Sequence, residues 1–355
     1  MRLNTPRGTT LSRLSCCVIA LMSAMLWRGA ADAQVEDPPV VERLGPDHLR
    51  LRWSGPDALD IYVSAQSDAP LGQARLVAAG DAAGVYDFRR PTPRRPYFIL
   101  RDRSDNSLWR VAERVLPLEQ GSNFRDLGGY PAADHKHVRW GLIYRTAANP
   151  MLTDGDFGYV RQLGLKADVD LRATDERTIY PDALPARTGA RYVADDYKFS
   201  APDDAYRVWL TSLAPQFRAV FQALLRNDGA VSFHCSAGQD RTGIAAALVL
   251  SALGVPRNVI IDDYLLSMRY RRPRFEFRKL DPAAYPGNGY VAFLASIPAS
   301  ELFAQPDLYD ANRVPYLEQT FEEIDRRWGD TPNYLQQELG VGPAEIAKLR
   351  AIYLE

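Results

Sequence analysis

One stretch of the sequence constrains the fold more than any other: an apolar strand, a glycine-containing loop and a long apolar helix follow one another between residues 230 and 253. Ala230 to Phe233 has the length and apolar character of a buried strand, and Gly254 is a stop signal for the helix. A buried strand that leads directly into a helix is typical of a central sheet flanked by helices. The sequence therefore predicts an α/β domain around this unit.

Further elements between residue 119 and the end of the chain fit the same class. Two more stretches read as strands, 138–144 and 167–171, and an amphipathic helix is predicted over Ala214 to Arg226. Another helix is predicted to begin at Pro256. Three more helices are predicted towards the C-terminus from apolar residues at helical spacing, namely Phe321, Ile324 and Trp328, then Tyr334, Leu335 and Leu339, then Ile346 and Leu349. Residues 119–355 thus form one predicted α/β domain.

The preceding part of the chain, residues 34–118, has a different pattern. Leu49, Leu51 and Trp53 alternate with arginines, which is the period of a strand with one buried face. Similar runs follow at 59–63, 97–100 and 109–115, and proline-containing turns separate them. The pattern predicts a small all-β sandwich, and it resembles a fibronectin type III or immunoglobulin-like module without the cysteine pair.

Residues 1–33 are typical of a secretory signal peptide. Three arginines precede the apolar run 14–27, and Ala31-Asp32-Ala33 supplies small residues at the cleavage position. We expect cleavage before Gln34 and export of the mature protein, either to the periplasm or as a secreted protein. A membrane anchor is the alternative, but the run is shorter than the ~20 apolar residues that a spanning helix needs.

The cysteines and the charge balance narrow the options further. Cys16 and Cys17 lie in the predicted signal peptide, so Cys235 is alone in the mature chain and has no internal disulfide partner. A single exported thiol suggests a use for it, although a buried cysteine can also serve as a small apolar residue. The 43 basic and 44 acidic residues leave a net charge of -1, so no overall field attracts nucleic acid or an anionic membrane.

The loop 234–242, with the sequence HCSAGQDRT, combines three chemical features in one place. Backbone N–H groups at the start of a helix favour an anion, and the helix dipole adds to this. The same field favours the thiolate form of Cys235, which is the nucleophilic form. Arg241 is close enough to hold a phosphate through two parallel hydrogen bonds, which lysine could not make. The loop therefore has what a thiol needs to cleave a phosphate ester.

The other loop residues have supporting parts in this interpretation. Gly238 permits a turn that a side chain would obstruct, and the hydroxyl of Thr242 could stabilise the thiolate as a leaving group. His234 is expected to orient the loop through hydrogen bonds. The predicted phosphate-binding loop consists of Ser236, Ala237, Gly238, Gln239 and Thr242. The structural alternative is a buried cysteine before an ordinary helix, but average residue usage makes this combination of residues rare.

The segment HCSAGQDRTG resembles the active-site loop of the protein tyrosine phosphatase superfamily. Its Asp-Arg-Thr-Gly ending is similar to that of the bacterial secreted tyrosine and lipid phosphatases. The resemblance covers residues 119–355. Further segments that match this subfamily are NFRDLGG at 123–129, GLIYR at 141–145, DLR at 170–172 followed by Glu176, and the pairs at 334–335 and 339–340.

The resemblance implies a role for three loop residues. Cys235 matches the nucleophile, Arg241 the phosphate clamp, and Asp240 the general acid that this subfamily carries inside the loop. The implied reaction is hydrolysis of phosphotyrosine, with phosphoserine or phosphothreonine as further substrates, through a cysteinyl-phosphate intermediate and without a metal or cofactor. Gln239 departs from the pattern, because the subfamily usually has lysine there, and the lost charge argues against activity on phosphoinositides.

A second candidate for the general acid lies upstream. Asp203 and Asp204 precede the nucleophile at about the distance where tyrosine phosphatases with a mobile acid loop carry their aspartate. Pro-Asp-Asp is also common turn chemistry, so a solvated turn or a helix cap is the other interpretation. The sequence favours Asp240, which directly precedes Arg241.

Three other groups of polar residues attract notice. Arg125 and Asp126 are expected to pair near the rim of the site. His135 and His137 flank a lysine, but they have no acidic or cysteine partner at ligand spacing, so no metal site is predicted. A basic cluster follows a predicted helix and could attract anionic substrates or membrane phosphate, or simply be solvated; it consists of Arg269, Arg271, Arg272, Arg274, Arg278 and Lys279.

Several functions are compatible with the same loop. The runner-up to a protein phosphatase is a phosphoinositide or inositol-phosphate phosphatase, so the expected partners are phosphorylated proteins or inositol lipids, with no nucleic acid and no stable membrane insertion. A sulfurtransferase also uses a loop cysteine, but it does not need Arg241 and Thr242. An inactive phospho-binding module would keep the loop without turnover. The β-sandwich could bind a partner of its own.

Overall fold

The computed structural model describes residues 39–55, 58–89, 95–278, 280–298, 300–305 and 307–355, all of which belong to the compact unit Asp37–Glu355. The predicted signal peptide and Lys279 lie outside the described residues. Within these ranges, no helix has both the length and the apolar character needed to cross a membrane.

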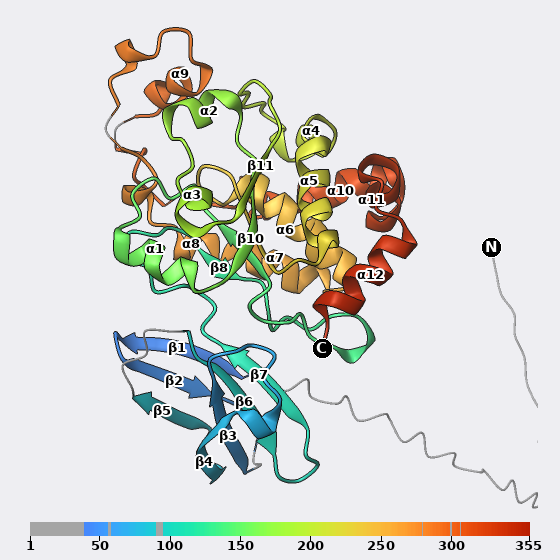
Figure 1. The fold of residues 1–355 in the computed structure, drawn as a ribbon. Coiled ribbons are helices and arrows are strands. Elements are labelled where there is room, and N and C mark those ends of the chain that lie inside the picture. The colour runs from blue at the N-terminus through green and yellow to red at the C-terminus, as the bar shows by residue number, and fades with distance from the viewer. Residues whose placement is uncertain (1–38, 56–57, 90–94, 279, 299, 306) are drawn as a thin grey trace, which may run out of the picture. The chain divides into compact units, whose positions relative to one another are not determined.

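Two antiparallel sheets form the N-terminal part of the described chain (Figure 1). One has the strand order β1-β2-β5 and the other the order β4-β3-β6-β7. The sheets share one hydrophobic core, in which Leu51 of β2 and Ile61 of β3 are completely buried. The strands are β1 (Val40–Gly45), β2 (His48–Arg52), β3 (Leu59–Ser64), β4 (Arg75–Asp81), β5 (Val85–Arg89), β6 (Tyr97–Asp102) and β7 (Leu108–Ala112).

The sequence predicts four of these strands, β2, β3, β6 and β7, but not the other three. The missed strands β1, β4 and β5 all lie at an edge of their sheet. Edge strands bury fewer side chains, so their apolar alternation is weak, and β4 carries Ala-Ala-Gly in its centre. The predicted end of β7 at Val115 is also wrong, because the strand stops at Ala112.

The second part of the chain contains a five-stranded sheet with the order β11-β10-β12-β9-β8. The first four strands run parallel, and β8 pairs antiparallel with β9 at the edge. Together with the helices, this sheet confirms the predicted α/β class. The strands are β8 (Arg125–Asp126), β9 (Ile143–Thr146), β10 (Leu165–Asp170), β11 (Arg191–Ala194) and β12 (Ala230–His234).

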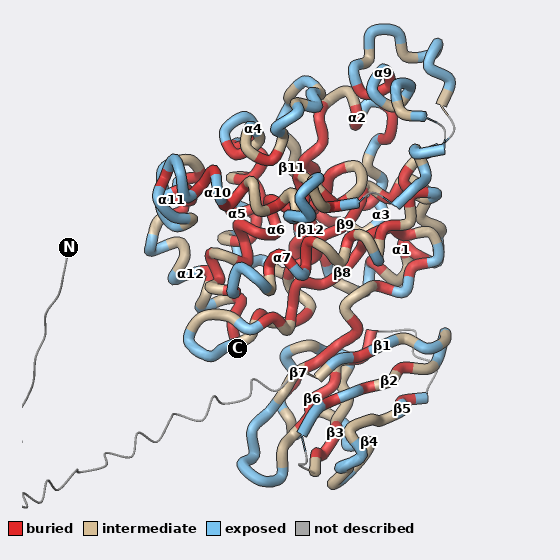
Figure 2. Tube along the Cα trace, turned by 180° about the vertical axis from the view of Figure 1, so that it is seen from behind, coloured by how far each residue is buried: buried red, intermediate tan, exposed pale blue. Residues whose placement is uncertain are grey.

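Helices cover both faces of this sheet (Figure 1). Neighbouring residues of β9 point to opposite faces. Ile143 joins the core formed with α5 and α6, whereas Tyr144 joins a separate core formed with α1 and α3. Figure 2 shows the buried residues gathered along the strands and α6. The helices are α1 (Asp154–Arg161), α2 (Thr174–Ile179), α3 (Leu184–Thr188), α4 (Ala205–Ser212), α5 (Ala214–Arg226), α6 (Asp240–Leu253), α7 (Arg257–Leu265), α8 (Ser267–Tyr270), α9 (Gly289–Ser296), α10 (Leu317–Trp328), α11 (Thr331–Leu339) and α12 (Pro343–Tyr353).

The helices predicted from periodicity are confirmed. The amphipathic helix has the predicted bounds of α5, the helix after Pro256 is α7, and the three C-terminal patterns are α10, α11 and α12. Gly254 ends α6 in the left-handed conformation with φ of 80°, which residues other than glycine rarely adopt. The strand–loop–helix unit at the centre of the prediction is therefore formed by β12, residues 235–239 and α6.

One strand is shorter than predicted. The sequence predicts a strand over 138–144, but β9 begins only at Ile143. Gly141 has a φ of 83°, which breaks an extended strand, and a side chain there would collide with the hydroxyl of Tyr97 at 2.9 Å. Val138 forms only an isolated bridge, with Leu354.

Candidate active site

Cys235 follows β12 directly and lines a cavity of about 330 Å³. Its side chain is buried and forms no disulfide. Most of the cavity wall is aromatic or aliphatic and comes from segments far apart in the sequence. It includes Phe199, Trp209, Phe277, Tyr290, Phe293 and Leu294. A reactant therefore meets the thiol inside a largely apolar cavity.

In the loop after Cys235, backbone carbonyl groups accept hydrogen bonds from the side chains of neighbouring segments. Asn123 donates its amide to the carbonyls of Ala237 at 3.1 Å and Gly238 at 2.8 Å. Arg145 donates to the carbonyl of Gly238 at 3.0 Å. Among the described residues, no hydrogen bond uses the N–H groups of residues 236–239. These donors are left for an anion at the N-terminus of α6.

Gly238 occupies a position that tolerates no side chain. Its φ of 65° lies in the left-handed region, and a Cβ atom would stand 2.4 Å from the carbonyl oxygen of Thr146. The loop can therefore approach the end of β9 this closely only with glycine at this position.

Arg241 is held in one orientation by a buried carboxylate. Its two terminal nitrogens bind the oxygens of Glu176 at 2.6 and 2.7 Å, and Nη1 also donates to the hydroxyl of Tyr197 at 2.8 Å. Burial disfavours the charged guanidinium, but Glu176 outweighs this and raises the pKa of Arg241 well above its ordinary value. Glu176 also accepts from the hydroxyl of Ser236 at 2.5 Å and from the backbone N–H of Ala173 at 2.8 Å. Glu176 thus links Arg241, the predicted phosphate clamp, to Ser236 of the loop.

His234 is buried among three carboxylates. Its Nε2 lies 3.2 Å from Asp182 and 3.5 Å from Asp168, and its Nδ1 lies 3.8 Å from Asp170. Burial disfavours the charged ring, but Asp170 and Asp168 outweigh it and raise the pKa of His234 well above its ordinary value. The Nδ1 atom of His234 also lies 3.2 Å from the carbonyl oxygen of Cys235, so the ring contacts the start of the loop, as expected from the sequence.

The same cluster is a candidate for metal binding in the described part of the chain. Ligand atoms of Asp168, Asp182 and His234 lie within 4.8 Å of one another. A protonated imidazole, however, has no lone pair to offer to a metal. Burial and the neighbouring Asp182 raise the pKa of Asp168 to about 7, so this carboxyl holds a proton well above its usual range. The three side chains are therefore better suited to hydrogen-bonding one another through their protons than to binding a metal ion.

Thr242 lies in the first turn of α6 and is completely buried. Its hydroxyl has no hydrogen-bond partner among the described residues. Burial of an unpaired hydroxyl costs stability, which a functional role can explain. The hydroxyl is free for the part expected from the sequence, donation to the thiolate.

The predicted pairing of Arg125 with Asp126 is wrong. Adjacent residues of β8 point to opposite faces of the strand. Arg125 pairs with Asp263 at 3.1 Å, and Asp263 also binds Arg145 at 2.6 Å. Asp126 pairs instead with Arg95 at 2.6 Å. Both residues are completely buried and do not lie at the rim; Arg125 supports the loop from below through Asp263 and Arg145.

Of the three candidate acids, Asp240 lines the cavity with Cys235, whereas Asp203 and Asp204 do not. Both upstream aspartates are exposed at the start of α4. Asp204 is the N-cap residue of that helix, but its side chain makes no capping hydrogen bond. The geometry therefore favours Asp240.

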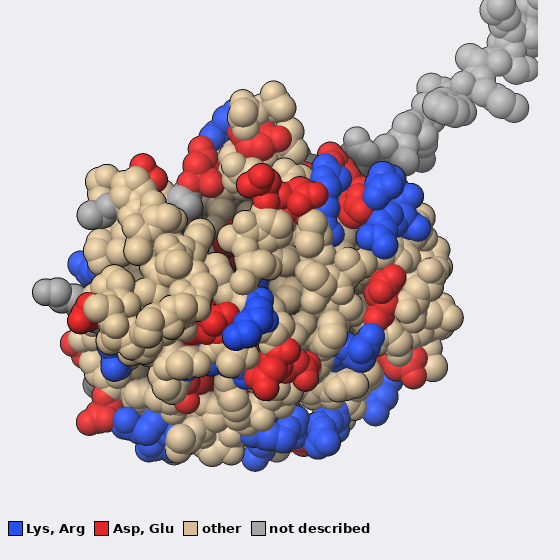
Figure 3. Space-filling view, turned by 90° about the horizontal axis from the view of Figure 1, so that it is seen from above, with Lys and Arg blue, Asp and Glu red and all other residues tan. Residues whose placement is uncertain are grey.

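The described residues of the predicted basic cluster differ in burial: Arg269, Arg274 and Arg278 are exposed, whereas Arg271 is buried. Arg272 donates to the backbone carbonyls of Leu118, Glu119 and Gly121, and Arg278 to that of Pro150. Arg271 is buried against the loop and is the described arginine of this cluster that lines the cavity. On the face seen in Figure 3, acidic and basic side chains are interspersed.

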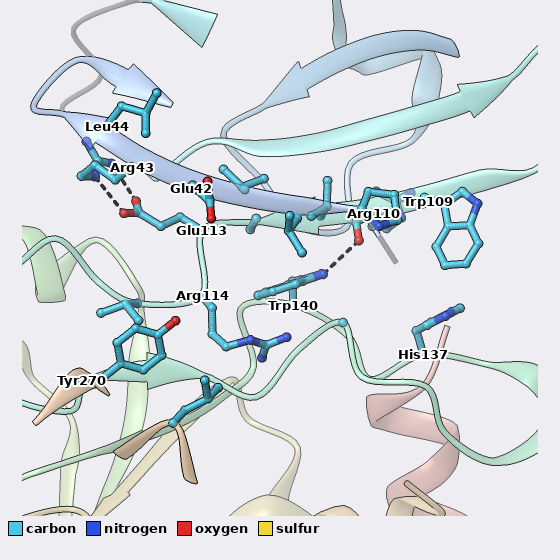
Figure 4. Close-up of a pocket in the computed structure, with 18 of the residues that line it drawn as sticks. Glu42, Arg43, Leu44, Trp109, Arg110, Glu113, Arg114, His137, Trp140 and Tyr270 are labelled. Atoms are coloured by element: carbon cyan, nitrogen blue, oxygen red, sulfur yellow. Dashed lines mark hydrogen bonds and ion pairs between the residues drawn. The ribbon is translucent and has the colours of Figure 1, made fainter. Parts of the chain in front are cut away.

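His135 and His137 lie away from the thiol. The ring of His137 packs against Trp109 at 5.0 Å between centroids and lines another cavity, of about 760 Å³ (Figure 4). In that cavity the indole of Trp140 donates to the carbonyl of Arg110 at 3.0 Å. Neither histidine belongs to the group of described residues that could hold a metal ion.

Comparison with known proteins agrees with this site. A family model described as tyrosine phosphatase family matches residues 116–355. The chain is 41% identical over 160 residues to a tyrosine-protein phosphatase of Nostoc commune, across 39% of this chain and 53% of that protein, or about half its length. It is 31% identical to a Cupriavidus necator protein with a provisional tyrosine-protein phosphatase name, across 67% of this chain and 88% of that one.

A third relative is the triple specificity protein phosphatase PtpB of Mycobacterium tuberculosis, which is 26% identical across 69% of this chain and its own full length (100%). A solved structure of P. aeruginosa TpbA with phosphotyrosine matches 36% of this chain and 70% of that chain at 19% identity, with a TM-score of 0.23, too low to bear on the fold. The chain therefore belongs to the tyrosine phosphatase family, and the resemblance seen in its loop is confirmed. It is a protein-tyrosine-phosphatase-like hydrolase.

Proposed function

We propose that the protein is a cysteine-dependent phosphomonoester hydrolase that acts on phosphotyrosine. One observation carries this proposal: Cys235 and Arg241 line the same cavity, and the loop between them has unpaired N–H groups among the described residues. The nucleophile and the anion site therefore coincide.

In the first step the thiolate of Cys235 attacks phosphorus, and the bond between phosphorus and the ester oxygen breaks. The electron pair of that bond goes to the leaving oxygen, which receives a proton from Asp240. The loop N–H groups and Arg241 bind the three non-bridging oxygens. The products are a cysteinyl-phosphate and a free phenol.

In the second step water attacks phosphorus while the carboxylate of Asp240 takes a proton from it. Sulfur leaves with the electron pair of its bond to phosphorus, and the hydroxyl of Thr242 stabilises the thiolate. Inorganic phosphate is released, and Asp240 is again protonated for the next cycle. In both steps the N–H groups at the N-terminus of α6 and the guanidinium of Arg241 stabilise the negative charge on the phosphoryl oxygens.

The cavity favours a single phosphate carried on an aromatic ring. Phe199, Trp209 and Tyr290 are among the aromatic residues of its wall. Both arginines that line it are neutralised, Arg241 by Glu176 and Arg271 by a bidentate pair with a buried glutamate. The described residues of the wall thus supply no unpaired cation for the additional phosphates of an inositol lipid.

Turnover of a substrate panel tests this preference. We expect kcat/KM for phosphotyrosine peptides to exceed that for inositol phosphates and for phosphoinositide vesicles by at least about tenfold, the factor that ~1.4 kcal/mol of differential binding provides. Phosphoserine and phosphothreonine peptides of the same sequence are the matched comparison, since the mycobacterial relative is named for triple specificity.

Other results of the same panel would contradict the proposal. Faster turnover of inositol lipids would make them the substrate class. Thiosulfate is added to the panel, because its turnover without phosphatase activity would indicate a sulfurtransferase. Binding of phosphopeptides without any hydrolysis would indicate a phospho-binding module.

We also propose export of the mature protein and a β-sandwich fold for its N-terminal sheets. The composition of residues 1–33 supports export, and the core shared by the two antiparallel sheets supports the sandwich. Cell fractionation of the full chain tests export, because an uncleaved cytosolic product would contradict it.

A further inference from the structure

The carboxyl group of Asp240 accepts two hydrogen bonds on the same oxygen. Tyr206 of α4 donates its hydroxyl to Oδ1, and Gln239 donates its side-chain amide to Oδ1 at 3.1 Å. No hydrogen bond from the described residues reaches Oδ2. An oxygen that already accepts from two donors is a poor place for a proton, so the acidic proton belongs on Oδ2.

Tyr206 is itself fixed as a donor. Its hydroxyl lies 2.6 Å from that of Tyr264 on α7. Because the single proton of Tyr206 goes to Asp240, Tyr264 must donate to Tyr206. Burial, followed by the charge of Asp240, raises the pKa of Tyr206 well above its ordinary value, so the hydroxyl keeps its proton. The ring stacks on Tyr316 at 5.9 Å between centroids, which restricts its rotation.

The amide of Gln239 can face only one way. Arg271 donates Nη1 to its Oε1 at 2.7 Å, and a guanidinium group has no acceptor. The amide oxygen must therefore face Arg271, and the NH₂ group must face Asp240. Arg271 in turn is held by Glu276 at 3.0 and 2.5 Å. Because the ion pair of Arg271 and Glu276 fixes the Gln239 amide, the hydrogen bond from that amide also fixes Asp240.

We propose that Tyr206 and Gln239 are positioning residues that hold the carboxyl of Asp240 with Oδ2 towards the leaving oxygen. The proposal rests on the proposed function, in which Asp240 is the general acid. Oδ1 can accept both hydrogen bonds whether Asp240 is protonated or ionised. Neither donor then has to move between the acid role of the first step and the base role of the second.

The test uses Tyr206→Phe, Gln239→Met and the double variant, with kcat/KM measured on aryl phosphates whose phenols differ in acidity. Each single variant is expected to lose roughly tenfold on phosphotyrosine, the effect typical of one hydrogen bond to a charged group. Strongly acidic phenols leave without a proton, so kcat/KM for their phosphates should stay near the wild-type value. The double variant should approach the behaviour of Asp240→Asn.

Tyr316→Phe is the matched control, because it removes a hydroxyl from the ring stacked on Tyr206 without touching Asp240. It should retain wild-type activity on every substrate. An equal loss on all leaving groups in Tyr206→Phe and Gln239→Met would overturn the proposal, since a disturbed fold lowers all rates alike. If thermal unfolding shows that Tyr206→Phe is not folded, the leaving-group dependence of Gln239→Met tests the positioning role by itself.

Asp240→Asn separates this proposal from the proposed function. If Asp240→Asn shows the leaving-group dependence while neither positioning variant does, the positioning role fails and the acid role stands. If Asp240→Asn itself shows no such dependence, the acid role fails.

Discussion

Cys235→Ser is expected to lose all measurable turnover of phosphate esters, to below ~1% of the wild-type rate, because a serine hydroxyl needs a base to become nucleophilic. The described residues place no such base there: the neighbouring carboxylates raise the pKa of His234 well above its ordinary value, and Asp240 is placed to protonate the leaving group. Steady-state assays with phosphotyrosine peptides measure the loss.

The same variant should still bind a phosphotyrosine peptide. The loop N–H groups and the Arg241–Glu176 pair do not depend on the thiol, so titration calorimetry is expected to give a dissociation constant near the wild-type KM. Cys235→Ala is the matched variant, which lacks even the hydroxyl and should behave identically. Turnover above the stated level in either variant would mean that another group is the nucleophile.

Asp240→Asn is expected to have the second largest effect. A general acid contributes roughly 10²- to 10⁴-fold, so kcat/KM for phosphotyrosine, which reports the first step alone, should fall by a factor in this range. The loss should shrink as the phenol becomes more acidic, because a better leaving group needs less protonation. A plot of log kcat/KM against the pKa of the leaving phenol measures this dependence.

Asp203→Asn and Asp204→Asn are the controls for the general acid. Both side chains are exposed at the start of α4 and do not line the cavity, so both variants should retain wild-type rates and stability. If either of them shows the leaving-group dependence and Asp240→Asn does not, the acid is supplied by a mobile segment upstream.

The parts of the site that the sequence predicts are those with local signals. The order of strand, loop and helix around Cys235 is contiguous, and Gly238 and Gly254 occupy turns that only glycine fits easily. Long amphipathic helices such as α5 and α10 have a strong period: α5 has the predicted bounds, and the three residues that predict a helix near residue 321 all lie in α10. In the N-terminal sheets the edge strands β1, β4 and β5 lack this signal, whereas β7, also at an edge, alternates clearly enough to be predicted.

The contacts that orient the catalytic groups could not be predicted, because they join distant parts of the chain. Glu176 lies 65 residues before Arg241, and Tyr206 lies 34 residues before Asp240. Only the fold brings them together. The sequence did single out Glu176, because it follows a segment that matches the family. The match did not show that Glu176 binds Arg241. The error over Arg125 has the same origin, since its partner Asp263 is 138 residues away.

The central claim, covalent catalysis by Cys235, is tested most directly by trapping the cysteinyl-phosphate. Asp240→Asn lacks the base for the second step, so a phosphate of a strongly acidic phenol should phosphorylate this variant faster than water can release the phosphate. After a rapid denaturing quench, mass spectrometry of the peptide that contains Cys235 should show one added phosphoryl group, and the Cys235→Ser, Asp240→Asn double variant should show none. Release of phenol without a phosphoryl group on Cys235, or with the group on another residue, would contradict the account.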